Sequence, residues 1–197
     1  MIKSLKRKYI KINKKLLLFL SKKKHLTIIY NFFNTIISEE YILIKKSVKF
    51  PHIPQGSDFD LYVLDEDEFS KLVVDYFEKF DNYEIIFTES TIGSIQLDLL
   101  FKEKFVYKFD LFDSTHLPNL FNKSFLEDSL SKKIIHYFQY KNREMRINVP
   151  STPYENLIRF VEYEMYPEKI HHLVHLDKLS DDEKSELKVM VKKYTNL

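Results

Sequence analysis

Two aspartates separated by one residue, Asp58 and Asp60, are the part of this sequence best suited to chemistry. They lie in a strand-like run that ends at Val63, and alternate side chains of a strand point to the same face. Neighbouring carboxylates repel each other unless a cation lies between them. The spacing therefore predicts a metal site with Asp58 and Asp60 as ligands.

The segments on either side of Lys102–Lys104 predict a β-hairpin that carries further acids. With these three residues as the loop, Asp98 lies opposite Lys108, and Gln96 lies opposite Asp110. Asp98 and Asp110 then share one polar face as diagonal neighbours, roughly 7 Å apart. Asp98 or Asp110 could therefore supply a third carboxylate beside Asp58 and Asp60. An ion pair across the hairpin is the simpler alternative for Asp98.

This arrangement is suited to two-metal phosphoryl transfer. It combines a strand with Asp-x-Asp, a following helix and a third aspartate on a nearby strand. Two carboxylates hold the metal ions, while the third orients or activates the acceptor oxygen. The helix expected after the strand begins with four acids, residues 65–68. Acids at that end complement the helix dipole, so we assign none of the four to catalysis.

Periodicity, capping residues and turn residues predict the elements that position these side chains. Helices are expected at residues 26–37, 65–80, 154–166, 167–176 and 180–194, and strands at 41–44, 58–64, 84–88, 94–101, 105–112 and 145–149. Residues 115–131 are expected to be irregular or helical. The prediction is an α/β (α+β) chain with a mixed-sheet core at residues 26–113 and a mainly helical part at 114–197.

The composition fits one globular unit. The chain has 197 residues, of which 44% are hydrophobic, and it contains two glycines, six prolines and no cysteine. This content supports one core, without an independent second domain. The absence of cysteine excludes disulfides and thiolate chemistry.

Charge is distributed unevenly along the chain. Residues 1–24 contain ten Lys or Arg and no acid, whereas the remainder contains 21 basic and 29 acidic residues. A basic helix is predicted at residues 1–25. It either packs on the body or contacts an anionic partner or membrane surface. The apolar run at 16–20 is far shorter than the roughly 20 residues that span a bilayer, so a cytoplasmic location is expected.

The order of motifs resembles the nucleotidyltransferase superfamily of DNA polymerase beta-like fold. In that family a Gly-Ser or Gly-Gly after the first strand precedes Asp-x-Asp on the second. Here the strand from Tyr41 leads to Lys46-Ser47, and ten residues later comes Asp58-Phe-Asp60. Lys46 replaces the glycine that lets backbone N–H groups approach nucleotide phosphates. Residues 152–176 also resemble the helical tail of uncharacterised nucleotidyltransferase-like proteins from bacterial surface-polysaccharide clusters.

This resemblance implies transfer of a nucleoside monophosphate from an NTP to a small acceptor, such as a sugar or sugar phosphate, with Mg²⁺ or Mn²⁺. Asp58 and Asp60 would bind metal. Asp98 matches the position of the family's third carboxylate best, and Asp110 is the second candidate. The candidates for phosphate binding are Lys45, Lys46, Ser47, Ser57, Lys169 and His172. Gly56-Ser57 itself is read as a turn and not as the phosphate loop.

Two other functions remain open. A nucleotidyltransferase that modifies a protein or tRNA would use the basic residues 1–24 to contact its partner. A catalytically silent binding module is favoured by Lys46 in place of glycine. His171 and His175 have the i, i+4 spacing of zinc ligands, but no third ligand is evident nearby. The sequence does not indicate the nucleotide or the oligomeric state.

Overall fold

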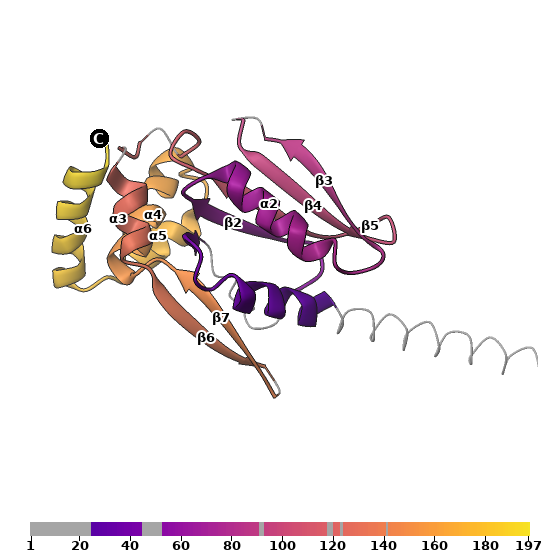
Figure 1. The fold of residues 1–197 in the computed structure, drawn as a ribbon. Coiled ribbons are helices and arrows are strands. Elements are labelled where there is room, and N and C mark those ends of the chain that lie inside the picture. The colour runs from indigo at the N-terminus through magenta and orange to yellow at the C-terminus, as the bar shows by residue number, and fades with distance from the viewer. Residues whose placement is uncertain (1–24, 45–52, 91–92, 118–119, 123, 141) are drawn as a thin grey trace, which may run out of the picture.

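The computed structural model describes residues 25–44, 53–90, 93–117, 120–122, 124–140 and 142–197 (Figure 1). The predicted phosphate-binding residues Lys45, Lys46 and Ser47 lie outside these ranges, as do residues 1–24 of the predicted basic helix. The chain is an α+β protein with a mixed sheet and a helical C-terminal region, as predicted.

A five-stranded mixed sheet forms the centre of the molecule. In spatial order its strands are β1 (Tyr41–Leu43), β2 (Ser57–Val63), β5 (Lys104–Phe112), β4 (Ile95–Phe101) and β3 (Tyr83–Glu89). β2 and β5 are parallel, and every other neighbouring pair is antiparallel. All five strands were expected from the sequence, within a few residues of these bounds.

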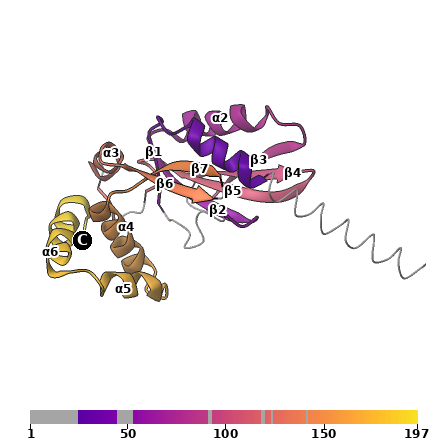
Figure 2. The same ribbon diagram turned by 90° about the horizontal axis from the view of Figure 1, so that it is seen from below.

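Helices cover one face of this sheet and gather beyond one of its ends. The helix at residues 25–35 and α2 (Glu66–Phe77) lie on the same side of the sheet (Figure 2). The C-terminal helices lie together beyond one end of the sheet (Figure 1), and they are α3 (Ser124–Ser131), α4 (Thr152–Met165), α5 (Ile170–Leu176) and α6 (Asp181–Tyr194). Within the described ranges, none of the helices combines the length and apolar character needed to cross a membrane.

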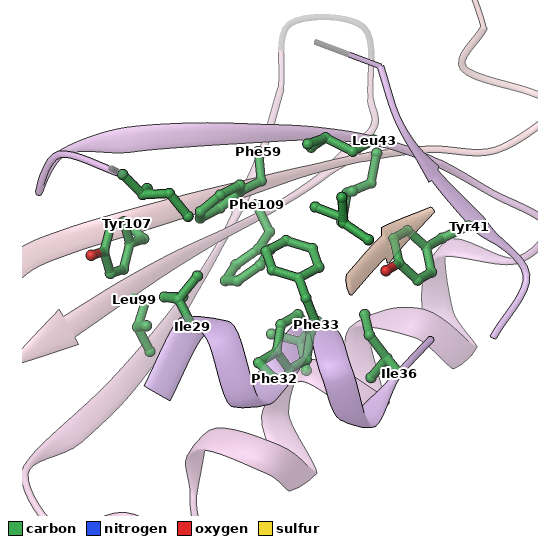
Figure 3. Packing of buried hydrophobic residues seen from close by; sticks show 14 of the residues in the cluster. Ile29, Phe32, Phe33, Ile36, Tyr41, Leu43, Phe59, Leu99, Tyr107 and Phe109 are labelled. Atoms are coloured by element: carbon green, nitrogen blue, oxygen red, sulfur yellow. The ribbon is translucent and has the colours of Figure 1, made fainter. Parts of the chain in front are cut away.

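Alternation along β2 divides its side chains between two environments. Phe59, Leu61 and Val63 are buried in the main core, under the two helices. Phe32 and Phe33 of the helix at 25–35 point toward this face of the sheet (Figure 3), and the Phe33 ring centroid lies 5.2 Å from that of Phe59. Asp58 and Asp60 therefore lie on the opposite face, away from this aromatic core.

A second apolar cluster joins the end of the sheet to the helical region. The ring of Tyr62 in β2 lies near those of Phe121 and of Phe125 in α3, and Phe125 in turn lies near Tyr154 of α4. Tyr62 alternates with Phe59 and Leu61, so it lies on the face that also carries Asp58 and Asp60. The carboxylates are thus bordered at one end by the C-terminal helices.

The hairpin between β4 and β5 differs slightly from the sequence prediction. The turn consists of Lys102 and Glu103 only, which have φ values of 51° and 62°, and Phe101 pairs with Lys104. Two positive φ values are typical of a tight hairpin turn whose twist matches that of the strands. The register shifts between Leu99 and Leu100, and this irregularity compensates for the shorter loop.

A second hairpin lies in the region that was expected to be mainly helical. It is formed by β6 (Ile134–Tyr140) and β7 (Arg143–Val149), and β7 contacts β1. The strand at residues 145–149 was predicted, but β6 was missed. Its β-branched and aromatic residues, Ile-Ile-His-Tyr-Phe-Gln-Tyr, are typical of strands.

Candidate functional site

The first part of the candidate site is the pair of aspartates on β2. Asp58 is exposed and Asp60 is half-buried, and both point away from the core formed by Phe59 and Leu61. The prediction that they share one face of a strand is confirmed. The turn predicted before them is also present, because Gly56 has φ +88° and its N–H donates to Val106 O at 2.7 Å.

The parallel neighbour β5 brings a third aspartate beside this pair. Asp60 is the register partner of Asp110, and Asp58 is the partner of Lys108. Neighbouring strands lie about 4.8 Å apart, so paired side chains on one face are in direct reach of each other. Asp110 is therefore the carboxylate nearest to the Asp-x-Asp motif across the sheet.

The next strand, β4, adds Asp98 on the other side of β5. Asp98 is paired with Lys108 and Gln96 is paired with Asp110, as the sequence predicted. We call Asp58, Asp60, Asp98 and Asp110 together the acidic face. It spans three adjacent strands, and Lys108 is its central side chain.

Lys108 lies among these four aspartates and forms an ion pair with one of them. Its Nζ lies 3.1 Å from Asp110 Oδ2, and so the ion pair is made along β5 and not across the hairpin to Asp98. Burial by itself lowers the pKa of Lys108. The hydrogen bond and charge of Asp110, together with the charges of Asp58 and Asp60, outweigh that effect and raise the pKa above its ordinary value.

Asp110 is the most buried member of the acidic face. It is 7% exposed, and its Oδ1 is buried with no hydrogen-bond partner in the described part of the chain. Burial raises the pKa of this carboxyl. Lys108 opposes the shift, while the charges of Asp60 and Asp58 add to it. A buried carboxylate oxygen without a partner is costly, so Oδ1 of Asp110 is the atom of the acidic face with the greatest need for a cation or a hydrogen-bond donor.

The donor chemistry of the acidic face fits a hard divalent cation, because Mg²⁺ and Mn²⁺ prefer carboxylate oxygens. The potential ligand atoms of the acidic face are, however, further apart than those of a formed metal site. Among the described residues, only Glu66, Asp113 and His116 form a group of three or more whose potential ligand atoms all lie within 4.8 Å of one another. The assignment of metal to Asp58, Asp60 and Asp98 stays a prediction.

The group at Glu66, Asp113 and His116 was not singled out from the sequence. Glu66 Oε1 lies 2.8 Å from His116 Nδ1 and accepts the Asp113 N–H at 2.9 Å, while Oε2 accepts the Ile95 N–H at 3.0 Å. His116 Nδ1 also lies 3.3 Å from Asp113 Oδ1. The carboxylate of Glu66 is thereby occupied by three donors, and it ties the start of α2 to β4 and to the end of β5.

We expect Glu66→Gln to destabilise the fold, because the amide nitrogen cannot accept a hydrogen bond from a backbone N–H. The Glu66 side chain is 5% exposed, and one buried donor loses its acceptor. The expected loss is about 1–3 kcal/mol in the free energy of unfolding, measured by urea denaturation. Glu68→Gln, an exposed neighbour on α2, is the matched control. Equal stabilities of the two variants would contradict this structural role.

The remaining predicted phosphate contacts have other partners in the described chain. Ser57 Oγ donates to Pro54 O at 2.7 Å within the turn before β2. Lys169 Nζ lies 4.0 Å above the ring centroid of Tyr166. His172 is 1% exposed, and its Nε2 lies 2.9 Å from Glu162 Oε2, which counts against a phosphate contact by His172.

The polar side chains of α4 and α5 form internal contacts. Arg159 pairs with Glu155 one helical turn earlier, at 2.8 Å. His175 Nε2 lies 2.9 Å from Asn156 Oδ1. Burial, followed by the charges of Glu162 and Asp60, raises the pKa of Tyr62 well above its ordinary value. Tyr62 follows Asp60 by two residues on the same face of β2, and its ring lies near those of Phe121 and Phe125.

Comparisons with known proteins give no further assignment. A scan against models of protein families finds no match to this chain, and a search of curated proteins finds none either. What the site can do therefore has to be inferred from its own geometry and charge.

Proposed function

We propose that the chain is a metal-dependent nucleotidyltransferase with a DNA polymerase beta-like core, which transfers a nucleoside monophosphate from an NTP to a small acceptor. A sugar or sugar phosphate is the acceptor that the sequence resemblance suggests. The pairing of β2 with β5 gives the main support, because it sets Asp60 beside Asp110 with Asp58 on the same face. Mg²⁺ or Mn²⁺ would be held by these oxygens.

The third carboxylate of this proposal is Asp110, which was the second candidate from the sequence. Asp98 lies one strand further from the Asp-x-Asp motif, and Lys108 separates it from Asp58 in the register. Asp110 adjoins Asp60 directly and has a buried oxygen without a partner among the described residues. These two observations favour Asp110 over Asp98.

The proposed reaction moves a nucleotidyl group, the nucleoside monophosphate, from a pyrophosphate oxygen to an acceptor oxygen. The acceptor oxygen, from a sugar hydroxyl or a sugar phosphate, bonds to the α-phosphorus of the NTP. The bond from that phosphorus to the oxygen shared with the β-phosphorus breaks, and pyrophosphate leaves. A bound metal ion supplies stabilisation of the negative charge on the attacking and leaving oxygens. Asp58 and Asp60 would fix the ion, and where the acceptor is a hydroxyl we assign acceptance of its proton to Asp110.

A catalytically silent nucleotide-binding module is the second candidate, and two observations favour it. A lysine ammonium already pairs with Asp110. The potential ligand atoms of Asp58, Asp60 and Asp110 are also not gathered within 4.8 Å of one another. A chain that has lost catalysis would keep the fold and replace the metal charge with that of the lysine.

Calorimetric titration of each NTP, with and without Mg²⁺, tests the proposal. Wild type is expected to bind at least one NTP in a Mg²⁺-dependent manner, and Asp60→Asn is expected to lose roughly tenfold or more in affinity. Absence of NTP binding by wild type would refute the nucleotidyltransferase. Binding without release of pyrophosphate in the presence of candidate sugar acceptors would favour the silent module.

A further inference from the structure

We infer that Lys108 is a built-in counter-ion which competes with a divalent cation for the acidic face, and which must leave Asp110 before metal and nucleotide bind together. This inference rests on the proposed function and assigns a role to a residue within the same site. It implies that the metal alone binds weakly to the wild-type chain, and that the metal with an NTP binds well.

The register gives Lys108 its central position. Along one row across the sheet, Lys108 lies between Asp58 of β2 and Asp98 of β4. In the adjacent row, Asp110 lies between Asp60 and Gln96. Any cation shared by Asp58, Asp60 and Asp110 therefore has to occupy space beside the lysine side chain.

Lys108 neutralises only part of the negative charge of the acidic face. The acidic face has four carboxylates, and the ammonium of Lys108 forms its ion pair with one oxygen of Asp110, Oδ2. The other oxygen, Oδ1, is buried and has no partner in the described chain, although the side chain is nine-tenths buried. Lys108 thus fixes the position of Asp110 but leaves one of its two oxygens without a partner. Such a carboxylate is suited to bind a divalent cation, whose charge is twice that of the lysine.

Lys108 can vacate the position without a change in the strand. Its side chain is 25% exposed, and a lysine has four rotatable methylenes, so its ammonium can swing away while the β5 backbone stays paired. The triphosphate of an NTP would offer the displaced ammonium a new negative partner. Nucleotide would therefore promote metal binding, because it relieves the repulsion between Lys108 and the ion.

Calorimetric titration of Mn²⁺ alone into Lys108→Gln and wild type tests this competition. Removal of one positive charge beside the ion is expected to tighten Mn²⁺ binding by roughly tenfold or more. Lys104→Gln, which removes an exposed lysine from the same strand, is the matched control and is expected to leave the affinity unchanged. Unchanged or weaker Mn²⁺ binding by Lys108→Gln would overturn the inference.

Lys108→Arg separates charge from packing and covers the case in which Lys108→Gln does not fold. Arginine keeps the positive charge, so its Mn²⁺ affinity is expected to stay as weak as that of wild type. Clearly tighter Mn²⁺ binding by Lys108→Arg would overturn the inference. In the double variant Lys108→Gln with Asp110→Asn, the gain is expected to disappear, because the released carboxylate is gone.

The same titrations distinguish this inference from the proposed function. If wild type binds Mn²⁺ with an NTP but Lys108→Gln gains no affinity for Mn²⁺ alone, the inference fails and the nucleotidyltransferase stands. If Lys108→Gln gains Mn²⁺ affinity but neither protein binds an NTP, the counter-ion role stands and the nucleotidyltransferase fails.

Discussion

Asp60→Asn is expected to lower the rate of nucleotidyl transfer by roughly 10²–10³-fold or more while the fold stays intact. Asp60 is next to Asp58 on its own face of β2 and is the cross-strand partner of Asp110. An amide at this position removes the negative charge that would hold the metal ion together with those two carboxylates. The amide has nearly the same size as the carboxylate. We therefore expect the effect in turnover, measured as pyrophosphate release, and not in the thermal midpoint of unfolding.

Asp75→Asn is the control for this loss of charge. Asp75 is exposed on α2, which covers the other face of the sheet, and the same substitution there is expected to leave turnover unchanged. Asp98→Asn gives a second comparison, with a smaller expected effect than Asp60→Asn because Asp98 lies beyond Lys108. Turnover by Asp60→Asn at the wild-type rate would refute the metal assignment.

Phe109→Ala is expected to destabilise the protein by about 3–5 kcal/mol, measured as the free energy of unfolding in urea. The ring is fully buried and lies near Phe32, Phe59 and Phe77, with centroid distances of 5.4, 5.2 and 5.9 Å. Phe109 lies among the buried side chains under the sheet (Figure 3), so its truncation to alanine is expected to leave a cavity there. Because the typical stability of a domain is about 5–15 kcal/mol, a large part of it would be lost.

Phe105→Ala, near the start of the same strand, is the matched control. Phe105 is 41% exposed, and the expected loss is less than about 1 kcal/mol. Similar losses for the two variants would show that burial under the helices does not determine the stability of β5. Phe109 also separates Lys108 from Asp110 in the sequence, so loosening it is expected to disturb both members of the ion pair.

Local sequence patterns are sufficient to predict much of the site. Alternation in β2 assigns Phe59 to the core and Asp58 to the opposite face, and the structure agrees. The hairpin register from Gln96 to Leu99 was also predicted correctly, although its turn is one residue shorter than expected. Both successes depend on period-two alternation, which leaves few acceptable registers when one face is buried.

Features that depend on distant segments could not be predicted in the same way. Nothing local to Asp60 or Asp110 specifies that β2 and β5 pair in parallel, because this pairing follows from the packing of whole elements. Lys108 forms its ion pair with Asp110 and not with Asp98, and this depends on the conformation of the lysine side chain. Glu66 was read only as part of an acidic helix start, and its contact with His116 needed the fold.

The strand β6 shows a further limit of local reading. Ile134 and Ile135 are both exposed, at 45% each, so the alternation that marks a half-buried strand is weak there. Pairing with β7 along its whole length determines the conformation of this segment. The pairing therefore supplies what weak alternation does not indicate, although the residue types of β6 favour a strand.

The parallel pairing of β2 with β5 also determines when the acidic face can exist during folding. Asp60 and Asp110 come from strands separated by α2, β3 and β4, so this pair forms only after a long chain segment has closed. In a chain emerging from the ribosome, the proposed cation site would form only after β5 has been synthesised and has docked beside β2. Affinity for a divalent cation would then report completed folding of the sheet, and an amino-terminal fragment ending before β5 would lack it.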